Sequence, residues 1–210
     1  MQSCWLNKKD ENKKIIVFFC GWGMDETCVS HLICDDFDIF VLYDYRNCEF
    51  DFSLIDFQKY DEKYLIAWSM GGYIANLFEE IFNNFDKKIT INSTNKIIDD
   101  DFGIPKRVYA VTVRLFSEES KDKFVLNMFN TNRKYEINRN LIELKEELIA
   151  IQNVNFSNEI KYDEAIISKK DFVVPTKNQI KFWENKTKIR LLEASHYPFD
   201  IFSKWSEIIC

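Results

Sequence analysis

Short hydrophobic runs alternate along this chain with segments of helical periodicity. The runs predict strands at residues 15–20, 39–43, 64–67, 88–92, 164–168 and 188–192. Most of these runs contain few polar positions, which is typical of strands that helices cover on both faces of a sheet. Because strands and helices alternate, we expect an α/β fold with a mostly parallel central sheet.

Apolar residues at helical spacing predict three helices beside these strands. The first follows Asp25 and reaches about Ile33, the second begins at Met70, and the third covers about residues 198–209. In each of them the apolar face is expected to pack against the sheet rather than to bind a cofactor.

Residues 116–156 interrupt the alternation of strands and helices. They predict two helices, 122–130 and 140–152, with no strand between them. An insertion of this kind inside a sheet domain is a natural position for a lid, although it is also compatible with a further packing pair of helices. We therefore expect a single domain over residues 1–210, with a lid insertion at about 116–156.

A strand, a sharp turn and a helix follow one another around Ser69. The strand reaches the small residue Ala67, Ser69 follows, and Gly71 stands near the start of the next helix. This is the context of the G-x-S-x-G nucleophile motif, with alanine in place of the first glycine. The turn lifts the serine hydroxyl clear of the sheet, and the helix N-terminus favours developing negative charge. Ser69 is therefore the predicted nucleophile.

The first strong strand runs into the sequence Cys20-Gly21-Trp22-Gly23. An oxyanion hole needs two N–H donors directed at the reacting carbonyl oxygen. We assign these donors to the backbone N–H groups of Trp22 and of Met70, which directly follows the predicted nucleophile. Taken alone, the glycine turn is equally compatible with a purely structural role.

The chain contains two histidines, and only one follows a strand late in the sequence. His196 lies between the last predicted strand and the last predicted helix, whereas His31 lies on an early helix. Sites of open α/β sheets gather at the carboxyl ends of strands, so His196 is the predicted general base.

The acid that orients this histidine is expected after a strand as well. Asp171 follows the strand at 164–168 and precedes His196, which gives the chain order Ser-Asp-His of this fold. It would hold the imidazole in the required tautomer. The rival candidate is the run Asp99–Asp101, which reads more simply as a solvated loop.

Composition limits the remaining possibilities. The 210 residues carry a formal net charge of −6, which argues against wholesale binding to nucleic acid or to an anionic membrane. No apolar run approaches the roughly 18–20 residues of a membrane span, and the first ten residues lack the apolar core of a signal peptide, so we expect a cytoplasmic protein. Cys28, His31 and Cys34 faintly resemble a metal cluster, but buried cysteines beside a surface histidine are the simpler interpretation. We expect neither a metal nor a cofactor.

Four phrases together resemble one family of the α/β-hydrolase superfamily. They are Cys20-Gly21-Trp22-Gly23, Ala67-Trp68-Ser69-Met70-Gly71-Gly72, Gly103-Ile104-Pro105 and Ser195-His196-Tyr197-Pro198-Phe199. They are similar to phrases of the short pimeloyl-[acyl-carrier protein] methyl ester esterases of the BioG type. The resemblance implies a serine esterase of biotin synthesis that cleaves the methyl ester of pimeloyl-carrier protein. It also implies a catalytic triad of Ser69, Asp171 and His196, with Trp22 and Met70 as oxyanion donors.

Charge is distributed unevenly along the chain. Between residues 104 and 145 there are nine basic and five acidic residues, although the whole chain is acidic. Carrier proteins are strongly acidic, so Arg133, Lys134 and Arg139 are candidates for binding the carrier beside the site. The alternative is that these residues lie on solvated helix faces. A general esterase or thioesterase for small acyl groups, and a non-catalytic interaction protein on a hydrolase scaffold, remain the competing hypotheses.

Overall fold

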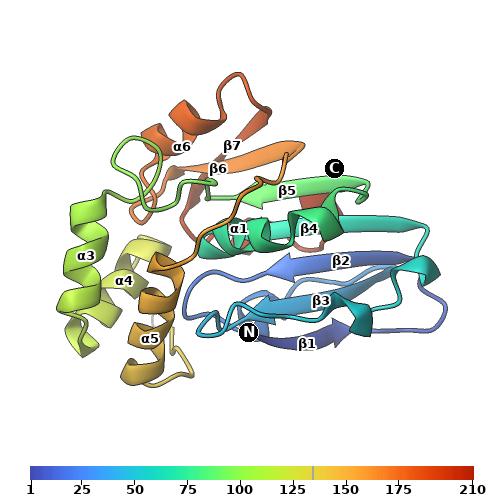
Figure 1. Ribbon diagram of the computed structural model, residues 1–210, viewed down its shortest axis with the longest axis horizontal. Helices are drawn as coiled ribbons and strands as arrows, with labels where there is room; N and C mark the ends of the chain where they lie inside the picture. Colours follow the sequence, from blue (N-terminus) through green and yellow to red (C-terminus); the bar gives the residue numbers. More distant parts are fainter. Residues whose placement is uncertain (134) are drawn as a thin grey trace.

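A seven-stranded sheet forms the centre of the molecule (Figure 1), and the computed structural model describes residues 1–133 and 135–210. The strand order is β1-β3-β2-β4-β5-β6-β7. Strands β2 to β7 pair in parallel, and β1 runs antiparallel to β3 at one edge. The strands are β1 (Gln2–Asn7), β2 (Lys14–Phe19), β3 (Phe37–Tyr43), β4 (Glu62–Trp68), β5 (Lys87–Ile91), β6 (Glu164–Lys170) and β7 (Lys188–Ser195). The predicted α/β fold is thus confirmed, with β1 as an added strand.

Both faces of this sheet are covered, as two neighbouring residues of β2 illustrate. Phe19 packs edge-on against Phe82 at 5.8 Å between ring centroids, whereas Phe18 packs against Trp205 at 5.2 Å. Successive side chains of a strand point to opposite faces. Phe82 belongs to the segment formed by α1 (Met70–Ile74), η4 (Ala75–Phe78) and α2 (Glu79–Phe82), and Trp205 belongs to the C-terminal segment. These two segments therefore enclose the sheet between them.

Three helices separate β5 from β6 and lie together at one end of the sheet (Figure 1). They are α3 (Lys106–Arg114), α4 (Glu118–Phe129) and α5 (Leu141–Gln152). Their end of the sheet is the one to which the arrows of β2, β3 and β5 point, which is the edge where sites of this fold class form. The sequence predicted α4 and α5 but missed α3. That helix contains three valines and a threonine, and β-branched residues are typical of strands.

The remaining helical segments are short. They are η1 (Glu26–Val29), η2 (Phe52–Leu54), η3 (Phe57–Lys59), α6 (Thr176–Trp183), η5 (Phe199–Ile201) and α7 (Ser206–Ile209). The predicted helix over 198–209 is wrong, because the backbone is extended at Phe202. There the chain pairs with Ile33, whose N–H donates to Ser203 at 3.0 Å and whose carbonyl accepts from Trp205 at 3.2 Å. The predicted helix over 25–33 is likewise reduced to the single turn η1.

Candidate active site

Ser69 occupies the sharp turn between β4 and α1. Its backbone has φ 53° and ψ −126°, a conformation that residues other than glycine rarely adopt. Hydrogen bonds hold it there, since the Ser69 N–H donates to Ile91 O at 2.8 Å and the Ser69 carbonyl accepts from Gly72 N–H at 3.0 Å. Strain of this kind is a feature of nucleophile turns in α/β-hydrolases.

Gly71 permits this turn to lie against the end of β2. A Cβ atom at Gly71 would stand 2.4 Å from the carbonyl oxygen of Cys20 and 2.6 Å from that of Phe19. Any side chain would therefore push α1 away from the strand. The small residue that the sequence motif requires two positions after the serine is thus explained by close contact between two backbones.

His196 and Asp171 converge on Ser69 from the ends of two other strands. His196 follows β7, and its Nε2 lies 2.8 Å from the Ser69 Oγ. Asp171 follows β6, and its Oδ2 lies 2.8 Å from the His196 Nδ1. All three side chains are buried. The structure therefore brings together the three residues that the sequence singled out, in hydrogen-bonding order.

The Asp171 carboxylate is held by donors from its own loop and from α6. Its Oδ1 accepts the backbone N–H groups of Val173 and Val174, both at 2.8 Å. Its Oδ2 accepts from Gln179 Nε2 at 2.8 Å, besides its contact with His196. By contrast, the rival residue Asp101 is exposed and pairs with Lys181 at 2.7 Å.

The loop of His196 is fixed by two residues that the sequence analysis did not single out. The His196 carbonyl accepts from Trp68 Nε1 at 3.0 Å and from Asn92 Nδ2 at 2.9 Å. Asn92 stands directly after β5 with φ 48°, a left-handed conformation that asparagine tolerates better than most residues. A signal was available for both residues, because each directly follows or ends a strand at the carboxyl edge.

Trp22 and Met70, the predicted oxyanion donors, both lie next to Ser69 at the cavity. Trp22 stands in the turn after β2, and Met70 is the first residue of α1. Within residues 1–133 and 135–210, neither backbone N–H donates to a protein acceptor. Both residues line the same cavity as Ser69. Their N–H groups are therefore available to a ligand bound beside the serine.

That cavity has a volume of about 490 Å³ and lies between the sheet and the inserted helices. Most of its walls are apolar, with a few polar or basic groups. The apolar lining includes Ile104, Val108, Val111, Leu115, Phe124, Leu148, Phe172 and Val173, and the polar lining includes Arg107, Thr112, Ser120, Lys123 and Asn127. A cavity of this composition suits an acyl chain whose reacting end reaches Ser69.

The three candidate carrier-binding residues differ from one another in the structure. The Arg133 side chain is 42% exposed, pairs with Asp200 and lies 4.6 Å from the centre of the Phe129 ring. Arg139 is only 10% exposed, and its guanidinium is bound to Asp44 and Glu147, so the prediction that it faces a carrier is wrong. Lys134 lies outside the described residues.

Two kinds of feature are absent from the described part of the chain. No helix there is both long and apolar enough to cross a lipid bilayer. In the same residues, no group of three or more histidine, cysteine, aspartate or glutamate side chains is arranged to hold a metal ion.

The mostly parallel sheet, with a strained serine turn at the carboxyl edge, defines an α/β-hydrolase. The fold agrees with that of a solved candidate aryl esterase from Burkholderia cenocepacia, with a TM-score of 0.64 and 13% identity over 94% of this chain and 87% of that one. The chain belongs to the BioG family, because the family model described as pimeloyl-ACP methyl esterase BioG matches residues 1–208.

Two individual relatives are similar over nearly the whole of this chain, and one of them is a solved BioG. The crystal structure of BioG from Haemophilus influenzae has a TM-score of 0.86 and 26% identity, and covers 99% of both chains. A malonyl-[acyl-carrier protein] O-methyltransferase from Bacteroides fragilis is 33% identical over an aligned length of 203, and the match covers 91% of this chain. The chain spans only 41% of the length of that relative.

Proposed function

We propose that this protein hydrolyses the methyl ester of pimeloyl-[acyl-carrier protein], which would release the free carboxylate in the synthesis of a biotin precursor. The observation that carries the proposal is the hydrogen-bonded series from Asp171 through His196 to Ser69, which opens on an apolar cavity. Membership of the BioG family supplies the substrate class.

The first half of the reaction forms an acyl-enzyme. His196 Nε2 takes the proton of the Ser69 hydroxyl as the Ser69 oxygen attacks the ester carbonyl carbon. The N–H groups of Trp22 and Met70 donate to the oxyanion of the tetrahedral intermediate. When the intermediate collapses, the C–O bond to the methoxy group breaks, and methanol leaves with the proton from His196.

Water completes the reaction in the second half. His196 removes a proton from a water molecule, whose oxygen attacks the acyl carbon, and the bond to Ser69 Oγ then breaks as His196 returns the proton to the serine. Asp171 remains ionised and stabilises the imidazolium in both halves. The products are methanol and a carboxylate.

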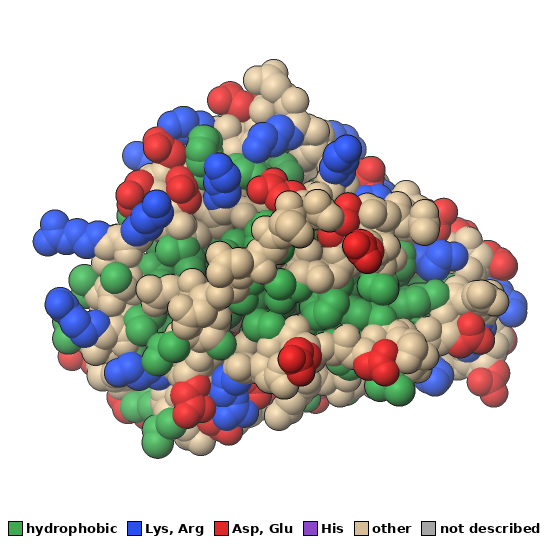
Figure 2. All heavy atoms as spheres, in the orientation of Figure 1, with side chains coloured by type: hydrophobic (Ala, Val, Ile, Leu, Met, Phe, Trp, Pro, Cys, Tyr) green, Lys and Arg blue, Asp and Glu red, His purple; other side chains and the backbone are tan. Residues whose placement is uncertain are grey.

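The inserted helices would act as the lid of this site and as the surface that meets the carrier. Residues of α3, α4 and α5 line the cavity, and Arg107 and Lys123 place basic groups in its wall. Figure 2 shows hydrophobic side chains over this end of the molecule with lysine and arginine side chains along its outer edge. Of the candidate carrier-binding residues that the structure describes, Arg133 is exposed and Arg139 is not, so we include Arg133 in the proposed carrier-binding surface.

The test compares a carrier-linked methyl ester with a small free methyl ester such as dimethyl pimelate. We expect both to be hydrolysed, with a higher kcat/KM for the carrier-linked ester, and we expect mass spectrometry to find the acyl group on Ser69 after rapid quenching. A small-acyl esterase without a carrier would instead show equal kcat/KM values. If neither ester were hydrolysed, the proposed esterase activity itself would be contradicted.

A further inference from the structure

Glu147 is a fully buried carboxylate in the middle of the apolar face of α5. Leu144, Leu148 and Ile151 share that face, and Glu147 is 0% exposed. Burying a carboxylate costs free energy unless charges and hydrogen bonds compensate for it. An apolar residue would complete this face at no such cost, so the contacts of Glu147 need an explanation beyond packing.

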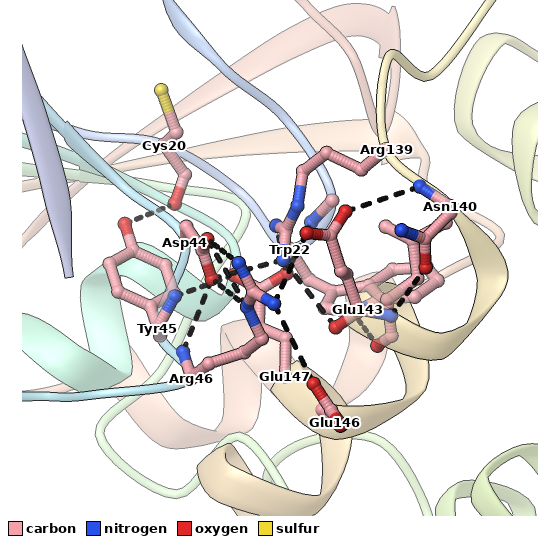
Figure 3. Close-up of polar contacts among 12 residues, drawn as sticks. Cys20, Trp22, Asp44, Tyr45, Arg46, Arg139, Asn140, Glu143, Glu146 and Glu147 are labelled. Carbon is pink, nitrogen blue, oxygen red and sulfur yellow. Dashed lines mark hydrogen bonds and ion pairs between the residues drawn. The ribbon is translucent and has the colours of Figure 1, made fainter.

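Those contacts reach the turn that carries Trp22. The Glu147 Oε2 accepts the backbone N–H of Gly23 at 3.1 Å, and its Oε1 accepts the backbone N–H of Tyr45 at 2.9 Å. Figure 3 shows this carboxylate from α5 among residues of two loops of the sheet domain. A single side chain of the insertion therefore binds the loops after β2 and β3 at once.

Further contacts hold the segment Gly21–Gly23, which we call the oxyanion turn. The Trp22 indole Nε1 donates to Leu144 O of α5 at 2.9 Å. Gly23 has φ +72°, and a Cβ atom there would lie 3.1 Å from the Leu144 side chain. On the other side of Trp22, the Tyr45 hydroxyl donates to Cys20 O at 2.7 Å. The turn is therefore held both before and after Trp22, which lines the cavity.

Arg139 supplies the charge that allows Glu147 to be buried. Its Nη1 donates to Glu147 at 2.7 Å and its Nη2 donates to Asp44 at 3.0 Å (Figure 3). Burial raises the pKa of the Glu147 carboxyl, while the charge of Arg139 acts in the opposite direction. Burial also acts to raise the pKa of Asp44, but bonds from Arg46 and the charge of Arg139 outweigh it and hold that pKa below its usual value.

We propose that Glu147 is a positioning residue for ester hydrolysis, because it fixes the oxyanion turn so that the Trp22 N–H is directed at the reacting carbonyl oxygen. This inference rests on the proposed function. It makes helix α5 part of the apparatus that stabilises the transition state, in addition to being a wall of the acyl cavity. Glu147 itself does not touch the substrate cavity.

The main test is Glu147→Gln, with hydrolysis of a small methyl ester as the readout. A carboxylate accepts at both oxygens, whereas an amide accepts at one, so either Gly23 or Tyr45 loses its acceptor. A displaced oxyanion donor weakens the transition state more than the ground state. We therefore expect kcat to fall about 10-fold while KM stays within about 2-fold.

The binding affinity of a tetrahedral inhibitor distinguishes a positioning role from a merely structural one, because a structural role would leave that affinity unchanged. Butylboronic acid forms a bond from boron to the Ser69 oxygen, the serine proton passes to His196, and the anionic adduct requires the same oxyanion donors. We expect Glu147→Gln to weaken its binding by about the same factor by which kcat/KM falls. A lowered melting temperature with unchanged kcat and unchanged boronate affinity at 25 °C would overturn the proposal and leave Glu147 as an anchor of α5.

Two variants control for loss of charge and for loss of buried contacts. Glu143→Gln makes the same change one turn earlier on α5, where the side chain pairs with Arg46 and caps its own helix. Glu164→Gln changes an equally buried carboxylate at the start of β6, which pairs with Lys87 and Arg190. In the described part of the chain, Glu164 makes no hydrogen bond or ion pair with Glu147 or Arg139. Both should keep kcat and boronate affinity within about 2-fold of the unmodified protein.

A second variant decides the matter if Glu147→Gln does not fold. Glu147→Asp keeps the buried charge beside Arg139 but shortens the side chain by one methylene, so its carboxylate cannot reach both Gly23 and Tyr45. It should reduce kcat and boronate affinity together, by a few-fold, and an unchanged pair of values would overturn the proposal. Failure of the proposed function looks different, because the unmodified protein would then neither hydrolyse the ester nor bind the boronate.

Discussion

The two sides of the serine are built from different parts of the chain. On one side, Asp171 and His196 come from the ends of β6 and β7, and neutral donors such as Gln179 and two backbone N–H groups hold the carboxylate. On the other side, the oxyanion turn is tied to the inserted helix α5 through buried charges. In the proposed mechanism, proton transfer therefore depends on the sheet domain, whereas transition-state stabilisation depends also on the insertion.

The largest effect is expected when the Ser69 Oγ is removed, because both sides of the site act on the reaction of this atom. Ser69→Ala should lower kcat for a methyl ester by a factor of about 10⁶, because His196 loses the hydroxyl that it activates and only the oxyanion donors and substrate binding still assist the reaction. The melting temperature should stay within a few degrees, since a single hydroxyl is lost. Substantial residual turnover would identify another nucleophile.

Changing the acid tests the side of the site that belongs to the sheet. Asp171→Asn should lower kcat about 10⁴-fold, because the amide no longer selects the required tautomer of His196. Asp101→Asn is the matched control, since Asp101 is exposed and pairs only with Lys181 among the described residues. A severe effect at Asp101 together with a mild effect at Asp171 would reverse the assignment.

Gln179 allows the supports of the two sides to be compared directly. Gln179 is fully buried and donates to the Asp171 Oδ2 at 2.8 Å. Its position is comparable to that of Glu147, which is also fully buried and accepts a hydrogen bond from the oxyanion turn. Gln179→Leu should lower kcat about 5-fold to 10-fold, because the carboxylate keeps its two backbone donors but loses one restraint on its orientation. The affinity of Gln179→Leu for butylboronic acid should fall less than that of Glu147→Gln if Gln179 supports proton transfer and Glu147 supports the oxyanion donors.

The smallest effect is expected at the surface. Arg133→Ala should lower kcat/KM for a carrier-linked ester about 2-fold to 5-fold, mainly through a slower association rate, and should not change hydrolysis of a free ester. About 0.5 M salt should reproduce the effect in the unmodified protein. Equal losses on both substrates would mean that the inserted helices had been disturbed.

Most of the sheet and the serine turn could be predicted from the sequence, because both depend on residues close together in the chain. Strand β2 is an uninterrupted apolar run after its first residue, Lys14, and the spacing from Ala67 to Gly71 follows from backbone contact at a single turn. Strand β1 escaped prediction because five of its six residues are only partly buried, so it lacks an apolar run. Asp171 and His196 were found because each directly follows a strand.

The role of Glu147 could not be predicted in the same way. Helix α5 contains three glutamates, Glu143, Glu146 and Glu147, and only contacts with distant parts of the chain distinguish them. One weak signal existed, since Glu147 stands three residues after Leu144 and one before Leu148, within the apolar stripe. Arg139 was misread for a related reason, because a basic residue in a polar segment looks exposed until its acidic partners are known.

The link between α5 and the oxyanion turn has a consequence for altering the enzyme. In many engineering schemes the segment above an active site is treated as an exchangeable module that changes substrate preference alone. Here residues 106–152 supply part of the lining of the acyl cavity. They also supply the Glu147 carboxylate that accepts a hydrogen bond from the oxyanion turn. A chimaera with a foreign insertion would lose rate as well as change selectivity. Only an exchange that also preserves Arg139, Leu144 and Glu147 would separate the two properties.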